Sequence, residues 1–310
     1  MRILPASGAV IAAALIAAAP LSAQAPSTIP GVTAAPMSAE DLVTLPRLGA
    51  PAVNAAGTLA VYTVTVTDPE TLKRTPQHYL IDLARPGAAP VPLAIAIRAS
   101  GLAFDADGAL YFLSSEHPDG AGAEARGRVW RVTLGKDGAA GAPQLVAGFP
   151  DADIAGFKLA STGDAIAVWG EVPRECRTFG CADAKARYLP GPGSGRLYDG
   201  SDGFVRHWDR WATPGLHNRI FVFGLVDGKV VGEGVPVDGD DPATGLVADT
   251  PTMPFGGAEE IAFSPDAEQL YFTARKADGA EPGSTNLDIY VSDLLGAPPR
   301  NLTADNTATD

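Results

Sequence analysis

The chain has 310 residues, a hydrophobic content of 46% and a formal net charge of −13 at pH 7. This length is enough for one large domain with a buried core, and a second complete domain would not fit beside it. The acidic balance excludes a nucleic-acid-binding protein, because such a protein needs clustered positive charge.

Residues 1–25 have the layout of a secretory signal peptide. Arg2 is followed by an apolar stretch over residues 9–19 and by small residues around Ala23 and Ala25, where we expect cleavage. The apolar stretch is shorter than the roughly 20 residues of a transmembrane helix, so we predict no membrane span after cleavage. A retained amino-terminal anchor is the alternative. The export signal predicts a periplasmic or secreted protein.

Residues 26–48 are predicted to form a spacer and a lead-in segment to the main domain. The spacer is rich in Pro, Ala and Thr, and the segment MSAEDLVTLPRLG follows it. Ser38 and Asp41 have the spacing of a helix-capping pair, so we expect one short helix here. No other segment has a helical period, and the rest of the chain is predicted to consist of strands.

A strand-turn-strand phrase recurs four times in the following sequence. It reads GAPAVNAAGTLAVYTVT from Gly49, GLAFDADGALYFLSS from Gly101, GFKLASTGDAIAVWGE from Gly156 and EIAFSPDAEQLYFTAR from Glu260. The corresponding turn positions are Gly57, Gly108, Gly163 and Ala267, which lie 51, 55 and 104 residues apart. A period of this size indicates an architecture built from repeated structural units.

A second pair of apolar runs follows the phrase in each repeat, as expected for two outer strands. The pairs are QHYLIDL with APVPLAI, RVWRVTL with PQLVAGF, NRIFVFGLV with KVVGEGVPV, and LDIYVSDL with PRNLTAD. In RVWRVTL the strand period places Trp130 and Val132 on one face and Val129 and Arg131 on the other. Four antiparallel strands in a repeat of about 50 residues are typical of a β-propeller blade. A β-sandwich is the alternative architecture.

Residues 49–310 are therefore predicted to form an all-β partial β-propeller of about four antiparallel four-stranded blades. The third repeat is the longest and has a single outer strand pair, which indicates one blade with an insertion over about residues 172–215. The last residues, NLTADNTATD, run from an outer strand into what looks like another blade. Because propellers have about four to eight blades, we expect an incomplete part of a larger ring.

Cys176 and Cys181 lie in the motif CRTFGC within this insertion. The export signal permits a disulfide between them, and closing so small a loop would stabilise the fold by about 2 kcal/mol. A zinc site is the alternative, but it needs further ligands and the nearest histidine is His207. The acidic turns DADG and DGDD lack the closing glutamate of a calcium loop. We predict no metal site and no cofactor.

Three motifs together resemble one family: SPD at residues 264–266, the segment SAEDLVTLPRLGAPAV, and VRHWDRW at residues 205–211. They are similar to the amino-terminal propeller of secreted bacterial serine peptidases of the prolyl oligopeptidase family, especially the dipeptidyl-peptidase and acylaminoacyl-peptidase branches. The resemblance covers residues 37–310. It implies a carboxy-terminal α/β-hydrolase partner domain with a Ser-Asp-His triad. The propeller would restrict access to that active site and help to bind peptide substrates.

The motif that carries the nucleophile of such peptidases, G-x-S-x-G, is missing from these 310 residues. Ser194 and Ser201 both lack the glycine two positions earlier. We therefore predict no catalytic residue here and no peptidase activity of this chain alone. The expected function is that of the substrate-gating and docking propeller of an exported serine exopeptidase acting on peptides. The alternative is a non-enzymatic periplasmic propeller, similar to that of the Tol system, that binds a protein or peptide partner.

Glu259 and Glu260 form an acidic pair beside the fourth phrase. Two neighbouring carboxylates suit the binding of a substrate ammonium group through charge-assisted hydrogen bonds. A solvated start of a strand is the alternative.

The motif FVRHWDRW is the second candidate for substrate contact. Interpreted as an extended strand, it places Arg206, Trp208 and Arg210 on one side and His207, Asp209 and Trp211 on the other. His207 and Asp209 suit a base and its orienting carboxylate, but the chain offers no nucleophile for them. A hairpin packed by its tryptophans and a hairpin facing the substrate remain the two interpretations.

Overall fold

The computed structural model describes residues 36–120, 126–135, 137–181, 195, 197–198, 200–201 and 203–309. The predicted signal peptide and most of the spacer lie outside these residues. The chain divides into two compact units, residues 1–43 and 44–310. In the described part, no helix has the length and apolar character needed to cross a membrane.

A short helix, α1 (Ala39–Thr44), forms where the capping pair predicts it. The backbone N–H and the hydroxyl of Ser38 both donate to Asp41 Oδ2, at 2.9 and 2.8 Å. The backbone N–H of Asp41 donates in return to Ser38 Oγ at 3.0 Å. These bonds from Ser38 lower the pKa of the Asp41 carboxyl, and the reciprocal pattern is that of a capping box.

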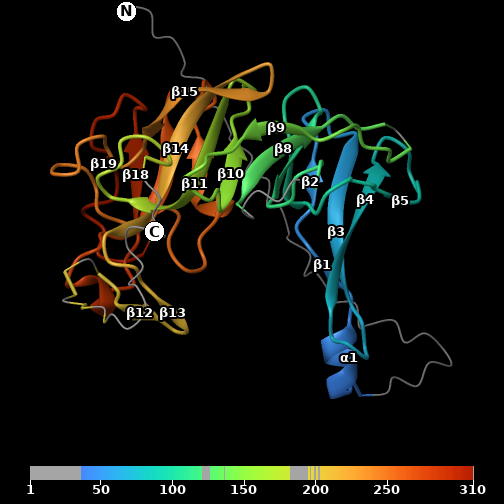
Figure 1. Ribbon diagram of the computed structural model, residues 1–310, viewed down its shortest axis with the longest axis horizontal. Coiled ribbons are helices and arrows are strands. Elements are labelled where there is room, and N and C mark those ends of the chain that lie inside the picture. The colour runs from blue at the N-terminus through green and yellow to red at the C-terminus, as the bar shows by residue number, and fades with distance from the viewer. Residues whose placement is uncertain are drawn as a thin grey trace, which may run out of the picture. The chain divides into compact units, whose positions relative to one another are not determined.

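The described part of residues 44–310 contains four larger antiparallel sheets and a separate two-stranded one, and in each larger sheet the chain runs through its strands in sequence order (Figure 1). The first sheet contains β1 (Arg47–Leu48), β2 (Ala52–Val53), β3 (Leu59–Thr67), β4 (Arg74–Asp82) and β5 (Val91–Pro92), with β1 and β2 both paired to β3. The second contains β6 (Ser100–Phe104), β7 (Leu110–Ser114), β8 (Arg128–Val132) and β9 (Gln144–Ala147).

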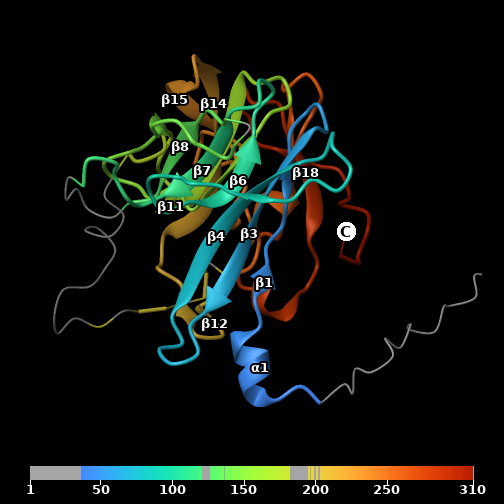
Figure 2. The ribbon, with the colours of Figure 1, turned by 90° about the vertical axis from the view of Figure 1, so that its right-hand side faces the viewer.

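The third and fourth sheets repeat this arrangement. The third contains β10 (Gly156–Leu159), β11 (Ala165–Pro173), β14 (Leu216–Val226) and β15 (Lys229–Pro236). The fourth contains β16 (Ile261–Phe263), β17 (Leu270–Ala274), β18 (Asp288–Ser292) and β19 (Arg300–Asn301). The all-β fold with antiparallel four-stranded sheets is confirmed. Figure 2 shows β3 beside β4, which is the longest strand pairing of the first sheet.

The same tight turn joins β2 to β3, β6 to β7, β10 to β11 and β16 to β17. The backbone N–H groups of Gly57, Gly108, Gly163 and Ala267 donate to the carbonyl three residues earlier, at 2.9, 3.3, 3.1 and 2.9 Å. All four residues have positive φ, at 66°, 86°, 81° and 58°. Glycine adopts this conformation without strain, whereas alanine does not.

Replacing Ala267 with glycine should therefore raise the unfolding free energy by about 0.5–1 kcal/mol, because it relieves the left-handed strain at this turn. Urea unfolding followed by circular dichroism measures the change. Gly108→Ala is the reverse experiment, since a Cβ there meets no atom within 4 Å and only the backbone conformation is tested. Stabilisation by Gly108→Ala would contradict the argument.

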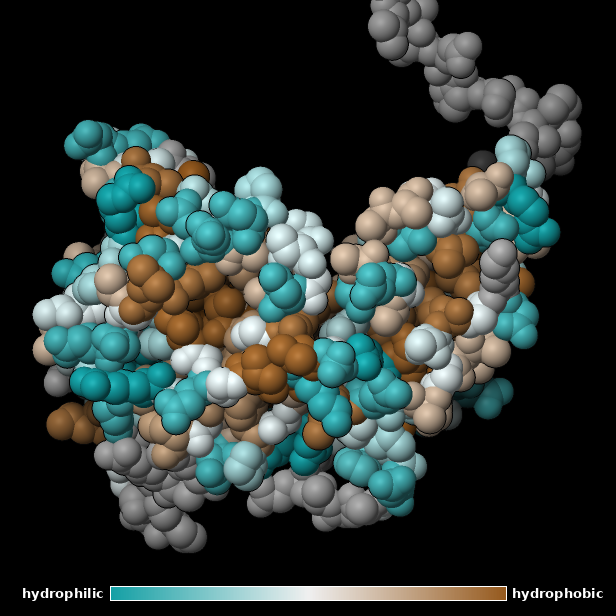
Figure 3. Space-filling view, turned by 90° about the horizontal axis from the view of Figure 1, so that it is seen from above, coloured by the Kyte–Doolittle hydropathy of each residue, from teal (hydrophilic) through white to brown (hydrophobic). Residues whose placement is uncertain are grey.

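The core lies between successive sheets. Val61, Leu110 and Trp130 belong to the cluster between the first and second sheets, and Val129, Phe221 and Phe223 to the cluster between the second and third. Trp130 and Val129 are neighbours in β8, so the predicted alternation is confirmed, but both faces of this strand are buried. The middle sheets are covered on both sides because sheets pack face to face. Seen from above, hydrophobic residues at the surface form patches between hydrophilic ones (Figure 3).

Candidate functional site

The motif FVRHWDRW forms a hairpin in the segment between β11 and β14. Its strands are β12 (Arg206–His207) and β13 (Arg210–Trp211), with Arg206 opposite Trp211 and His207 opposite Arg210. Directly opposed residues of an antiparallel pair share a face. The extended-strand prediction is therefore wrong, because the chain reverses at Trp208 and Asp209, where Trp208 has a φ of 56°. His207 and Arg210 share one face, and Arg206 and Trp211 share the other.

The rings of this hairpin contact one another and a neighbouring loop. The His207 ring lies 5.1 Å from Phe204, 6.1 Å from Trp208 and 6.0 Å from Phe255. Trp208 and Phe255 meet edge to face at 5.3 Å, although their side chains are 74% and 68% exposed. His207 Nδ1 is buried and has no hydrogen-bond partner among the described residues. The predicted base–carboxylate couple with Asp209 is therefore not made through this nitrogen.

Trp211 anchors the other face of the hairpin. The Arg206 guanidinium lies over its ring at 5.3 Å, and the Tyr198 ring lies 5.6 Å from it. The Tyr198 hydroxyl donates to the carbonyl of Ala212 at 2.8 Å. The hairpin is thus held by ring contacts and by a cation–π interaction.

A cavity of about 270 Å³ lies against this hairpin. The insertion supplies an aromatic wall, formed by Tyr198, Phe204 and Trp211, together with His207. The lining also includes a polar wall, which contains Glu171 at the end of β11, His217 in β14 and Asp249. A second cavity of about 270 Å³ shares five residues with the first, so the two adjoin. The shared residues are Glu171, Arg210, Leu216, Met253 and Pro254.

The polar wall is fixed to β14. Asp249 Oδ1 accepts a hydrogen bond from the backbone N–H of Asn218 at 2.8 Å and lies 3.7 Å from His217 Nδ1. The Asn218 side-chain amide donates to the carbonyl of Pro251 at 2.8 Å. These bonds hold the loop after Ala248 beside the start of β14.

A buried carboxylate connects the insertion to the fourth sheet. Glu281, in η2 (Glu281–Gly283), pairs with Arg275 Nε at 3.1 Å and accepts from the backbone N–H of Phe204 at 3.2 Å. The Arg275 guanidinium also lies 5.1 Å from the Phe204 ring. A Cβ at residue 203 would lie 2.0 Å from Glu281 Oε2 and would displace this carboxylate, and the φ of 89° at Gly203 also favours glycine. Burial raises the pKa of Glu281, although Arg275 opposes the shift.

Glu281→Gln should change how stability depends on pH. Because the folded pKa is raised above the ordinary value of 4.5, the stability that Glu281 contributes is complete below that value and is lost as the pH rises through the folded pKa. The unfolding free energy of the native protein, relative to the variant, is expected to fall as the pH rises above 4.5. Urea unfolding of both proteins at pH values below and above 4.5 measures it. The exposed Glu268→Gln serves as the control, and a pH-independent difference would contradict the prediction.

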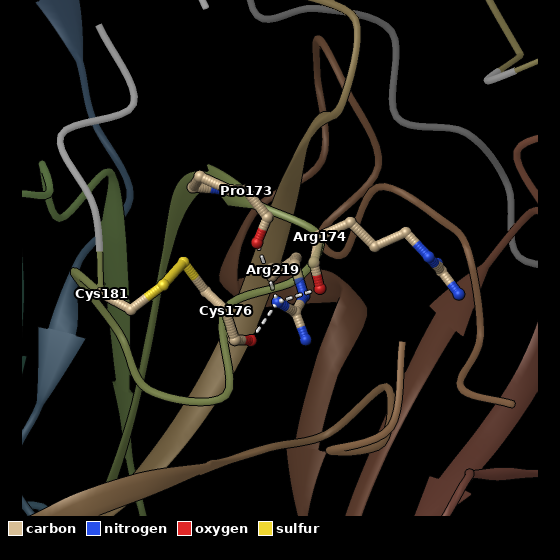
Figure 4. The surroundings of a disulfide bond; sticks show 5 residues. All are labelled: Pro173, Arg174, Cys176, Cys181 and Arg219. Carbon is tan, nitrogen blue, oxygen red and sulfur yellow. Dashed lines mark hydrogen bonds between the residues drawn. A yellow bond between two sulfur atoms is a disulfide. The ribbon is translucent and has the colours of Figure 1, made fainter. Parts of the chain in front are cut away.

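The predicted disulfide is confirmed. Cys176 and Cys181 are bonded, with their Cα atoms 5.6 Å apart. Arg219 in β14 holds the start of this loop (Figure 4): its Nη1 donates to the carbonyls of Pro173, Arg174 and Cys176, at 3.2, 3.2 and 2.6 Å. Asp238 pairs with the same guanidinium through two bonds, Nε to Oδ2 at 2.6 Å and Nη2 to Oδ1 at 2.9 Å.

The acidic pair of the sequence lies away from the cavity lining. Glu259 and Glu260 belong to η1 (Ala258–Glu260), directly before β16. Glu260 Oε2 accepts from the backbone N–H of Thr252 at 2.8 Å, and Glu259 is exposed. Lys158 donates to the carbonyls of Ala258 and Ile261, and burial lowers the pKa of this lysine. Within the described ranges, no group of three or more His, Cys, Asp or Glu side chains is placed to hold a metal ion.

Sequence comparison finds relatives over a third of the chain. It is 30% identical over 103 residues to dipeptidyl-peptidase 5 of Porphyromonas gingivalis and 32% identical over 103 residues to dipeptidyl-peptidase 5 of Aspergillus fumigatus. These 103 residues are similar to a part of dipeptidyl-peptidase 5. The matched residues make up 33% of this chain but 14% of the bacterial relative, so the chain matches a small part of these peptidases. No protein-family model matches the sequence.

A solved structure shares the fold. The acylaminoacyl peptidase of Pyrococcus horikoshii superimposes with a TM-score of 0.50 and 12% sequence identity, over 85% of this chain and 33% of that chain. At this identity the likeness concerns the fold alone. Together with the dipeptidyl-peptidase 5 relatives, it confirms the resemblance seen in the sequence motifs.

Proposed function

We propose that this chain is the substrate-gating and docking part of an exported serine exopeptidase that acts on peptides. The observation that carries the proposal is the match to dipeptidyl-peptidase 5 in a chain built of four repeated antiparallel sheets. The sheets would be blades of a larger propeller. The nucleophile would belong to a carboxy-terminal α/β-hydrolase domain, because these residues contain no G-x-S-x-G motif.

The cavity beside the β12–β13 hairpin supports the docking role. It combines an aromatic wall with a few fixed polar groups, which is the usual composition of a small-ligand site. The disulfide supports an exported protein, because disulfides persist in oxidising compartments such as the periplasm.

The proposal is tested by reading the gene beyond the codon for Asp310 and assaying the encoded protein on a dipeptidyl chromogenic substrate. We expect the frame to continue into G-x-S-x-G with later Asp and His, and the encoded protein to cleave the substrate. These 310 residues alone should not cleave it. A stop codon, together with a cooperatively unfolding and inactive monomer, would overturn the peptidase role and leave a non-enzymatic binding propeller.

A further inference from the structure

A separate groove lies along β4 in the first sheet. Its volume is about 660 Å³, within the range of about 300–1,000 Å³ that is usual for ligand sites. The lining consists of residues 73–79, residues 92–99 and Glu116. None of these residues lines the cavity beside the β12–β13 hairpin. The groove is therefore a different surface from the candidate site.

The groove concentrates positive charge in an acidic protein. Lys73, Arg74 and Arg98 line it and are exposed, and Glu116 is the one acidic side chain among the described residues of the lining. His78 adds no charge at neutral pH, because burial lowers its pKa from the ordinary value of 6.5. Three cations and one acid leave the lining with a net charge of +2, whereas the whole chain carries −13. This local charge attracts an anionic ligand.

Glu116 does not use up the Arg98 side chain. Its Oε2 accepts a hydrogen bond from the backbone N–H of Arg98 at 2.8 Å, and its Oε1 lies 3.8 Å from Arg98 Nε. The two side chains are 72% and 50% exposed, so the pair is weak. A guanidinium has five N–H donors. Arg98 can therefore bind a ligand carboxylate while it stays beside Glu116.

The edge of β4 at the groove favours recognition by charge over the addition of a strand. β5 pairs with β4 only beyond His78, and in the part of the chain that the structure describes residues 74–77 pair with β3 alone. The His78 carbonyl accepts from the backbone N–H of Leu93 at 2.8 Å, so it faces away from β3. Backbone groups alternate in direction along a strand, so Pro76 faces the same way. Proline has no N–H and interrupts a hydrogen-bond ladder. A ligand here would be held mainly by its side chains.

The spacing of the cations fits an extended ligand. Arg74 begins β4, and Arg98 precedes Ala99, whose backbone is hydrogen-bonded to the His78 side chain. Arg74 and His78 are four residues apart in one strand, which corresponds to about 13 Å. An extended peptide has the same rise per residue, and its alternate side chains point to one side. Carboxylates spaced two and four residues apart would therefore reach both ends of the groove.

We propose that this groove docks an extended acidic peptide, with carboxylates at Lys73 and Arg74 at one end and at Arg98 at the other. The inference goes beyond the proposed function, because it assigns a second docking surface that has no residue in common with the cavity beside the hairpin. It also gives the chemistry of the ligand: negative side chains at alternate positions bind, and neutral or positive ones do not.

Fluorescence anisotropy of the full chain with labelled Thr-Glu-Thr-Glu-Thr-Glu-Thr tests the inference. The matched peptide has glutamine at each glutamate position. At an ionic strength of about 0.01 M the glutamate peptide should bind about tenfold more tightly than the glutamine peptide, as expected for three exposed ion pairs. Raising the ionic strength to about 0.15 M should remove most of this difference, because salt screens exposed charges.

Two triple variants locate the binding. Lys73→Gln, Arg74→Gln and Arg98→Gln together should abolish the preference for the glutamate peptide. The control combines Arg85→Gln, Lys229→Gln and Arg300→Gln, three exposed cations outside the groove, so it changes the net charge by the same amount. This control should keep the preference. Circular dichroism checks that both variants are folded.

The contrary outcomes are distinct. Equal affinity for the two peptides, or no binding of either, would overturn the inference. A glutamate preference that persists in the folded groove variant would show that the charges act elsewhere and would overturn it too. If a sulfated oligosaccharide binds in the groove and the glutamate peptide does not, a peptide is the wrong ligand. None of these results bears on the peptidase assignment, which the gene and substrate assays test separately.

Discussion

Replacing Asp238 with alanine is expected to lower the unfolding free energy by about 3–5 kcal/mol, because it leaves the buried charge of Arg219 without its counter-ion. The two side chains are 3% and 5% exposed and are joined by two hydrogen bonds. Arg219 also holds the carbonyls at the start of the disulfide loop. The variant should therefore weaken both the third sheet and the attachment of the insertion that carries the hairpin.

Urea unfolding followed by circular dichroism gives the loss. Asp240→Ala is the matched control, since Asp240 is exposed two positions further on and such substitutions change stability by about 0.5 kcal/mol or less. The double variant Arg219→Met with Asp238→Leu removes both charges, so the stability that it still loses reports the hydrogen bonds of Arg219 to the three carbonyls. Equal losses for Asp238→Ala and Asp240→Ala would contradict the assigned role of the ion pair.

The sheets were predictable because their signals are local. Alternating apolar runs and a left-handed turn recur in each repeat, and the turn is marked by glycine in three repeats and by Ala267 in the fourth. The capping pair of α1 is equally local, since Ser38 and Asp41 lie three residues apart. Such patterns specify strands and turns without knowledge of the tertiary fold.

The candidate site was only partly predictable. The hairpin motif was recognised, but its reversal at Trp208 was not, because Trp208 has a positive φ that tryptophan rarely adopts and Asp209 is the only turn-favouring residue there. Glu281 gave no signal, since an isolated acidic residue in a sequence is usually exposed. Asp238 was noted only as part of the acidic turn DGDD and not as the partner of Arg219. The Glu281 carboxylate accepts a hydrogen bond from the backbone N–H of Phe204, which lies 77 residues earlier in the sequence. Contacts of this kind are decided by the packing of sheets and lie beyond any local pattern.

Phe272→Ala is expected to cost about 3–5 kcal/mol of unfolding free energy, the usual loss for emptying a buried aromatic site. Phe272 is 2% exposed and stacks on Tyr290, with the ring centroids 5.8 Å apart. Both rings belong to the cluster between the third and fourth sheets, together with Trp169 and Ile220. Removing the ring leaves a cavity in the cluster where the third and fourth sheets pack against each other.

The destabilisation caused by Phe272→Ala should extend to the candidate site. Arg275 directly follows β17, the strand that contains Phe272, and its partner Glu281 holds the backbone of Phe204 in the cavity wall. Urea unfolding of Phe272→Ala measures the loss of unfolding free energy. Phe255→Ala, at an exposed residue of the same type, is the control. Phe255→Ala should change it by about 0.5 kcal/mol or less. If Phe272→Ala costs no more than this control, Phe272 does not contribute to the packing between the third and fourth sheets.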